Sequence, residues 1–303
     1  MSAAELPLVV LDVAQSRIER EGAVSQLLKR RRNVGRGHFI IFYAFYGEAQ
    51  GGVTQIQWLA VRLAALLLIC VTALQAESPV TYDCSPEDIE QFGLNCSEDE
   101  PCTVLLELTS AEAAGNRIVV TGNLHTRDAT LLSLLLTSDD GGVTWTEPVI
   151  RMRNAAFEQI EFWDGQTGWV SGESINPLAR NPFLLLTTDG GTNWRPKLIV
   201  EDEKFGTIAQ FHFSSIRSGE VVIDNSTKKS IHQELYSTET GGESWELKET
   251  ANQPLHLKGA RTPNQNGYRV RADAAGASFL LERGGGKNWE KVASFPIHVA
   301  DCH

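Results

Sequence analysis

The chain has 303 residues, a length that at about 150 residues per domain suggests about two domains. Asp and Glu outnumber Lys and Arg by 38 to 27, and this net charge of −11 argues against a protein that binds nucleic acid through its phosphates. Apolar residues at 42% and charged residues at 21% are typical of a soluble, packed protein and exclude a fully disordered chain.

Residues 63–74 form an uncharged apolar run of 12, preceded by Arg62 and followed by the small residue Ala76. This length is typical of a signal-peptide core, since a membrane-spanning helix needs ~20 apolar residues. We therefore predict a signal peptide over residues 53–76, cleaved near Ala76. The mature protein is then periplasmic or secreted, with no stable membrane span.

A signal peptide belongs at the N-terminus, so residues 1–52 are predicted to be a misassigned or disordered leader, with translation starting at Val53. Peptides from upstream of Val53 in the native host would contradict this. The alternative is an anchored protein whose cytoplasmic tail carries the basic residues 29–32. Cys70 follows the large residue Ile69, so lipidation is not expected.

Four cysteines follow the signal peptide: Cys84, Cys96, Cys102 and Cys302. An even number in an oxidising compartment predicts disulfides, at least one of which ties the two ends of the chain together. Three pairings are possible and the sequence does not choose among them; the pairing we favour is Cys102 with Cys302 and Cys84 with Cys96. The spacing does not match a zinc site. Residues 77–102 are predicted to form a surface cap.

Four segments repeat, each ending on a tryptophan: SDDGGVTW (138–145), TTDGGTNW (187–194), TETGGESW (238–245) and ERGGGKNW (282–289). The tryptophans are 49, 51 and 44 residues apart, which is the length of one four-stranded blade. Three predicted strands precede each segment and one follows it. The sequence therefore predicts an all-β propeller of about four four-stranded blades over residues 103–303.

In chain order, the strands predicted for the first blade (103–153) are 103–108, 117–122, 130–138 and 146–151. Those of the second blade (154–203) are 158–163, 167–174, 182–188 and 195–200. Those of the third blade (204–251) are 208–213, 219–224, 232–238 and 246–250. Those of the fourth blade (252–303) are 255–259, 267–273, 278–282 and 290–295.

The residue types of the repeat suit a tight hairpin. Glycine tolerates positive φ, an aspartate carboxylate accepts hydrogen bonds from turn amides, and a tryptophan can return to pack between sheets. We assign such structural roles to Ser138, Asp140, Gly142, Trp145, Thr187, Asp189, Gly191, Trp194, Gly242, Trp245, Gly286 and Trp289.

This pattern resembles the Asp-box of sialidases and related propellers, also called the bacterial neuraminidase repeat. The first two copies match it, through Thr144 and Asn193 as well. The third copy has Thr240 and the fourth has Gly284 where the pattern has Asp. Both keep Gly-Gly and Trp, so we expect their hairpins to survive without the carboxylate.

In the second repeat, GWVSG (168–172) followed by LLLTTDGGTNW (184–194) resembles the photosystem II assembly and stability factor family. The resemblance covers roughly residues 103–298. It implies a propeller that binds a partner protein or assists assembly without catalysis, and exported proteins of this kind also occur in bacteria that do not photosynthesise.

The alternative is a sialidase-like exo-glycoside hydrolase, or a propeller that binds glycans without turnover. A sialidase needs an arginine triad and a Tyr nucleophile activated by Glu. Its Arg-Ile-Pro motif is absent, because Val119 follows Arg117 and Ile118. No nucleophile is evident among Tyr82, Tyr236 and Tyr268. We therefore expect no catalytic residues, and no motif for a metal or cofactor is present.

If the repeated turns lie on one rim of the propeller, the second-to-third loops and the links between blades emerge on the opposite rim. We predict that basic residues on that rim form a docking surface for an acidic partner. They are His125, Arg127, Arg151, Arg153, Arg180, Lys204, Lys228 and Lys229. The alternative is a set of solvated charges, because the acidic residues Glu173, Glu201, Asp202 and Glu203 share these loops.

Overall fold

The structure, a computed structural model, describes residues 79–175, 178–260 and 267–303. The leader and signal peptide predicted for residues 1–76 lie outside these ranges. Within them, no helix is long and apolar enough to cross a bilayer.

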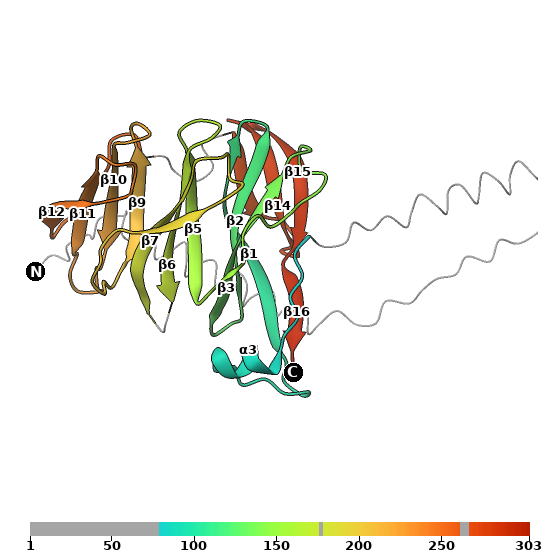
Figure 1. Cartoon of the computed structure of the whole chain (residues 1–303). Helices are drawn as coiled ribbons and strands as arrows, with labels where there is room; N and C mark the ends of the chain where they lie inside the picture. Colours follow the sequence, from blue (N-terminus) through green and yellow to red (C-terminus); the bar gives the residue numbers. More distant parts are fainter. Residues whose placement is uncertain (1–78, 176–177, 261–266) are drawn as a thin grey trace, which may run out of the picture. The chain divides into compact units, whose positions relative to one another are not determined.

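Four antiparallel sheets contain nearly all of the regular secondary structure of the described chain, consistent with a four-blade β-propeller. Figure 1 shows the sheets side by side in a row. The first blade contains β1 (Cys102–Ala114), β2 (Arg117–His125), β3 (Thr130–Ser138) and β4 (Met152–Arg153). The second contains β5 (Ala155–Phe162), β6 (Gly168–Ile175), β7 (Ala179–Thr187) and β8 (Arg195–Leu198). The third contains β9 (Thr207–Phe213), β10 (Gly219–Asp224), β11 (Gln233–Thr238) and β12 (Glu246–Ala251). The fourth contains β13 (Tyr268–Ala272), β14 (Ser278–Gly285) and β15 (Asn288–Pro296).

Two predicted strands are wrong. Residues 146–151 form only a bridge between Thr146 and Thr137, because Pro148 lacks the N–H that a longer ladder needs. Residues 255–259 form no strand, since the Leu255 and Leu257 amides bond to side chains of the third blade. The fourth blade therefore has three strands of its own.

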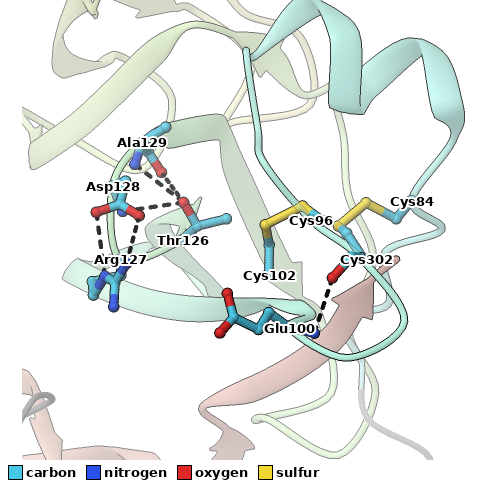
Figure 2. Close-up of a disulfide and its surroundings, with 10 residues drawn as sticks. Cys84, Cys96, Glu100, Cys102, Thr126, Arg127, Asp128, Ala129 and Cys302 are labelled. Carbon is cyan, nitrogen blue, oxygen red and sulfur yellow. Dashed lines mark hydrogen bonds and ion pairs between the residues drawn. A yellow bond between two sulfur atoms is a disulfide. The ribbon is translucent and has the colours of Figure 1, made fainter.

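The last strand, β16 (His298–Cys302), leaves the fourth blade and pairs with the free edge of β1. It brings Cys302 opposite Cys102, yet the disulfides are Cys84–Cys302 and Cys96–Cys102, with Cα–Cα distances of 5.4 and 5.2 Å (Figure 2). The predicted bridge between the two ends is confirmed, but the pairing we favoured is wrong. Cys84 precedes helix α3 (Pro86–Gln91) and Cys96 follows it. Cys84 bonds to β16, whereas Cys96 bonds to the first residue of β1.

Three hydrophobic cores join the blades in the order fourth, first, second, third. The core between the first and fourth blades contains Leu106 and Phe295, and the core between the first and second contains Leu135 and Phe157. A third core, containing Trp169 with residues of β9–β11, joins the second and third blades. Among the described residues, no such core joins the third blade to the fourth.

Buried polar side chains fix the register between neighbouring blades. Asn123 in β2 accepts a hydrogen bond from the Phe157 amide at 2.8 Å and donates one to its carbonyl at 3.1 Å. The Glu112 carboxylate accepts from the Phe162 amide at 3.0 Å. These bonds pair buried backbone groups that a slip between the sheets would leave unsatisfied.

Candidate functional site

The four repeated segments, 138–145, 187–194, 238–245 and 282–289, form four turns that we call the tryptophan turns. In the first, Asp140 accepts hydrogen bonds from the Thr144 hydroxyl at 2.5 Å, the Thr144 amide at 2.9 Å and the Val143 amide at 3.0 Å. The bonds from Thr144 and Ser138 hold the pKa of Asp140 far below its usual range. In the second turn, Asp189 accepts from the amides of Thr192 and Asn193 at 3.1 and 2.9 Å.

The third turn replaces the carboxylate with a hydroxyl. The Thr240 hydroxyl accepts from the Ser244 amide at 2.9 Å, as Asp140 does from Thr144. The fourth turn has Gly284 at this position, with φ +148°. There β14 and β15 continue their pairing almost to the tip of the turn. The fourth hairpin therefore forms without a polar staple.

In every tryptophan turn the indole N–H donates to a glycine carbonyl three residues earlier, at 3.0–3.2 Å. The first three turns also approach the preceding blade. A Cβ on Gly142 would lie 2.4 Å from Val292 of the fourth blade, and the Trp145 ring packs edge-on against Phe295 at 5.1 Å. Gly191 and Gly242 similarly approach Val119 and Trp169. The three glycines therefore lie in close contact with a neighbouring blade.

Two of the predicted docking residues bind the cap segment. Arg151 donates to the Thr81 carbonyl at 2.8 Å and pairs with Glu147 at 2.6 Å. Arg153 forms an ion pair with the buried Asp88 of α3. Burial opposes the ionised form of Asp88, but the bonds from Arg153 and neighbouring hydroxyls lower its pKa below the usual range. Arg151 and Arg153 thus hold the cap on the first blade.

The other predicted residues differ in how they are paired. Arg127 is exposed and pairs with its neighbour Asp128 at 3.2 Å (Figure 2). His125 Nδ1 lies 3.0 Å from the Thr126 carbonyl oxygen. Arg180 forms an ion pair with Glu203, and Lys204 forms one with Glu234. Lys228 and Lys229, both exposed, form no ion pair with any residue that the structure describes.

The segments around Arg180 and Lys204 adjoin each other at the rim between the second and third blades. The Gly206 amide donates to the Ala179 carbonyl at 3.1 Å, and Phe205 forms a β-bridge with Arg180. Beside this contact Leu178 is 64% exposed and Phe205 is 47% exposed. We call residues 178–180, 204–206 and 227–230 the second rim site. Its lysines could be predicted from the sequence, but Leu178 and Phe205 could not, because exposure of an apolar side chain depends on its neighbours in space.

A buried carboxylate supports the second rim site. Glu234 in β11 accepts a hydrogen bond from the Tyr236 hydroxyl at 2.8 Å and pairs with Lys204. Burial opposes its ionised form, but the bonds from Lys204 and Tyr236 hold the pKa of Glu234 below its usual range. Burial and the bond to Glu234 raise the pKa of Tyr236 well above its usual range. A tyrosine held neutral in this way is a poor nucleophile. The Tyr236–Glu234 pair therefore anchors the Lys204 segment.

Metal-ligating residues do not gather in the described ranges, where no group of three or more His, Cys, Asp or Glu side chains could hold a metal ion. Of the other tyrosines, Tyr82 lies beside Asp88, and burial together with that carboxylate raises the pKa of Tyr82 to about 12. Tyr268 packs against the core between the first and fourth blades.

No family model and no curated protein matches the chain. Among solved structures, YCF48 bound to D1 peptide is 20% identical, with a TM-score of 0.34, and the match covers 63% of this chain and 55% of that one. A polysaccharide lyase of family PL25, an ulvan lyase, is 9% identical with a TM-score of 0.37, covering 67% and 54%. Zg3597, a family 117 glycoside hydrolase from Zobellia galactanivorans, is 11% identical with a TM-score of 0.36, covering 73% and 74%. The chain spans about half the length of the first two.

Proposed function

We propose that the chain is an exported, non-enzymatic β-propeller that binds a segment of a partner protein at the second rim site. One observation carries the proposal: Leu178 and Phe205 are exposed on adjoining backbone segments. Lys228 and Lys229 lie between β10 and β11, a loop that the alternating direction of antiparallel strands places on the same rim. Exposed apolar side chains beside unpaired cations suit a peptide with apolar anchors and acidic residues.

The rigidity of the second rim site supports this role. Phe205 is held between a β-bridge to Arg180 and the ion pair of the adjacent Lys204 with Glu234. A ligand that binds there loses little free energy in ordering the site, because the backbone is already fixed. A scaffold for assembly, the role that the resemblance implies, needs such a preformed surface.

Export is part of the same proposal. Two disulfides, Cys84–Cys302 and Cys96–Cys102, suit an oxidising compartment, in agreement with the signal peptide proposed for residues 53–76. We further propose that the tryptophan turns are Asp-boxes whose role is structural. Their polar side chains form hydrogen bonds within the turns, and the indoles of the first and third turns pack against a neighbouring blade.

The proposal is tested with an array of fluorescent peptides that vary independently in acidic and apolar content. We expect acidic, apolar peptides to bind best. Leu178→Ser with Phe205→Ser should abolish the preference for apolar residues, and Lys228→Glu with Lys229→Glu the preference for acidic ones. The matched control is Ile216→Ser with Val143→Ser, which removes apolar side chains that are 51% and 81% exposed in turns on the opposite rim.

Equal binding by wild type and both rim variants would overturn the proposal. The competing function, a sialidase-like hydrolase or glycan-binding propeller, is assayed in parallel with a glycan array and a fluorogenic sialoside. Turnover, or glycan binding that the rim variants leave unchanged, would favour that alternative.

A further inference from the structure

The fourth blade has one packed face and one open face. Leu281 and Phe295 lie in the core shared with the first blade. Because successive side chains of a strand point to opposite faces, Leu280 and Glu282 lie on the other face. Cross-strand pairing places basic residues beside them: Arg269 and Lys291 are the register partners of Glu282, and Arg271 is the partner of Leu280. Arg269 and Arg271 form ion pairs with the buried Glu282 at 2.5 and 2.7 Å, so three cations share one carboxylate and the face keeps a net positive charge. We call Arg269, Arg271, Leu280, Glu282, Trp289 and Lys291 the basic face.

The fourth tryptophan turn lies at this face without the neighbour that the other three turns have. The Arg269 guanidinium lies 4.3 Å from the centre of the Trp289 ring. A Cβ on Gly286 would meet no atom within 4 Å, whereas its counterpart Gly142 packs against the preceding blade. In the first three turns this surface contacts a neighbouring blade, whereas in the fourth turn no described sheet covers it.

The third blade has the complementary open face. Phe211, Val221 and Tyr236 lie in the core with the second blade, so their neighbours along each strand point outward. The outward rows run Glu220–Ser237–Glu246 and Val222–Leu235–Glu249, by the register of β10, β11 and β12. The three glutamates are exposed, and Glu246 forms an ion pair with Lys248 at 2.6 Å, whereas Val222 is buried. We call Glu220, Leu235, Glu246 and Glu249 the acidic face.

Residues 255–259 complete the acidic face. The Leu255 amide donates to Gln233 at 2.7 Å and the Leu257 amide to Gln210 at 3.1 Å, which lays this segment across the sheet. At the junction of the second and third blades, the link residue Ile199, directly after β8, lies in the core between the two blades. Leu255 and Leu257, both half-buried, thus supply the apolar part of another inter-blade junction.

We propose that the basic face of one copy of this chain binds the acidic face of a second copy. The two faces have opposite charge, and each is one half of a junction that the same repeat forms three times within the chain. They belong to the two end members of the packed series of sheets, which Figure 1 shows at opposite ends of the row. A second copy, and not the chain's own other end, is therefore the occupant.

The contact is head-to-tail, because the two faces differ. Such an interface closes into a ring when the rotation between copies permits and extends into a filament otherwise. Two copies would supply eight blades to a closed ring. The Trp289 indole then contacts the third blade of the next copy, as Trp245 contacts the second blade of its own chain.

The first test measures the mass of the full chain by size-exclusion chromatography with light scattering over a range of concentrations. We expect more than one chain per particle. Reversing the acidic face (Glu220→Lys with Glu249→Lys) or the basic face (Arg269→Glu with Lys291→Glu) should weaken association by roughly tenfold or more. Mixing the two variants should restore association. The native basic face of one variant can bind the native acidic face of the other, and their two reversed faces also have opposite charge. The control, Glu98→Lys with Asp99→Lys, changes the same charges in the cap.

The second test separates association from closure within one chain. Wild-type protein is mixed with an isotope-labelled copy, and carboxylates are coupled to lysines with a carbodiimide. We expect links from Lys291 to Glu220 or Glu249 that join a labelled to an unlabelled chain. Links confined to single chains, or a single-chain mass at every concentration, would overturn the proposal. Circular dichroism of each variant shows whether a loss of association reflects unfolding.

Discussion

The first and fourth blades derive from the same repeat but lie in different environments. The first blade is packed on both faces, gains β16 at its free edge and is tied to the cap by Arg153 and two disulfides. The fourth blade has three strands and one packed face. Trp145 lies against Phe295 of another blade, whereas Trp289 has Arg269 of its own blade over its ring. The repeat thus determines the hairpin, and the neighbouring blade determines how much the hairpin stabilises the fold.

The largest difference between the ends should come from the long-range disulfide. Cys84–Cys302 closes a loop of 218 residues, and Cys96–Cys102 one of six. Because a longer loop restricts the unfolded chain more, Cys84→Ala with Cys302→Ala should lower the free energy of unfolding by about 5 kcal/mol, and Cys96→Ala with Cys102→Ala by about 2 kcal/mol. Urea denaturation measures both. Equal losses would mean that the long bridge does not restrain the fold through the first blade.

The tryptophans should give the next largest difference. Trp145→Ala removes an indole from between two blades and should cost about 3 kcal/mol. Trp289→Ala removes a ring from an open face, together with its contact to Arg269, and should cost less than about 1 kcal/mol in the monomer. Denaturation at a concentration where the protein is monomeric makes the comparison. A similar cost at both positions would show that the face of the fourth blade is covered within one chain.

The smallest effect should be an acid sensitivity of the first turn that the fourth turn lacks. The folded pKa of Asp140 lies below its unfolded value of about 3.8, chiefly through the bonds from Thr144. The stabilisation is therefore complete above the unfolded pKa and is lost as the pH falls toward the folded value. Asp140→Asn should reduce stability at pH 6 and flatten its pH dependence below pH 4. Gly284→Asp is not an equivalent restoration, because Gly284 has φ +148° and a Cβ there would collide with the Asn288 carbonyl.

Thermal unfolding of wild type and Asp140→Asn across this pH range checks the prediction. The matched variant is Thr240→Val, which removes the corresponding hydroxyl of the third turn without removing a titrating group. It should lower stability equally at all pH values. An acid dependence unchanged by Asp140→Asn would assign that dependence to other carboxylates, such as Asp88 or Glu234.

Most strands and all four tryptophan turns could be predicted because the signals that specify them are local. Gly142 needs positive φ, and Asp140 bonds to amides three and four residues away. The failures involve contacts distant in sequence. The alternating pattern of residues 255–259 predicted a strand, but the Leu255 and Leu257 amides bond instead to side chains of strands more than 20 residues earlier. Arg153 was predicted to face a partner and instead pairs with Asp88.

The sequence by itself determined the all-β repeat, the number of blades and the existence of an end-to-end disulfide, because a periodic pattern of glycine, tryptophan and alternating apolar residues specifies hairpins without reference to distant residues. Only the tertiary structure decided which cysteines bond, which arginines are free and which blade faces are covered. Those outcomes depend on which surfaces meet when separate sheets pack. The local sequence around a residue does not indicate which distant residue it will contact.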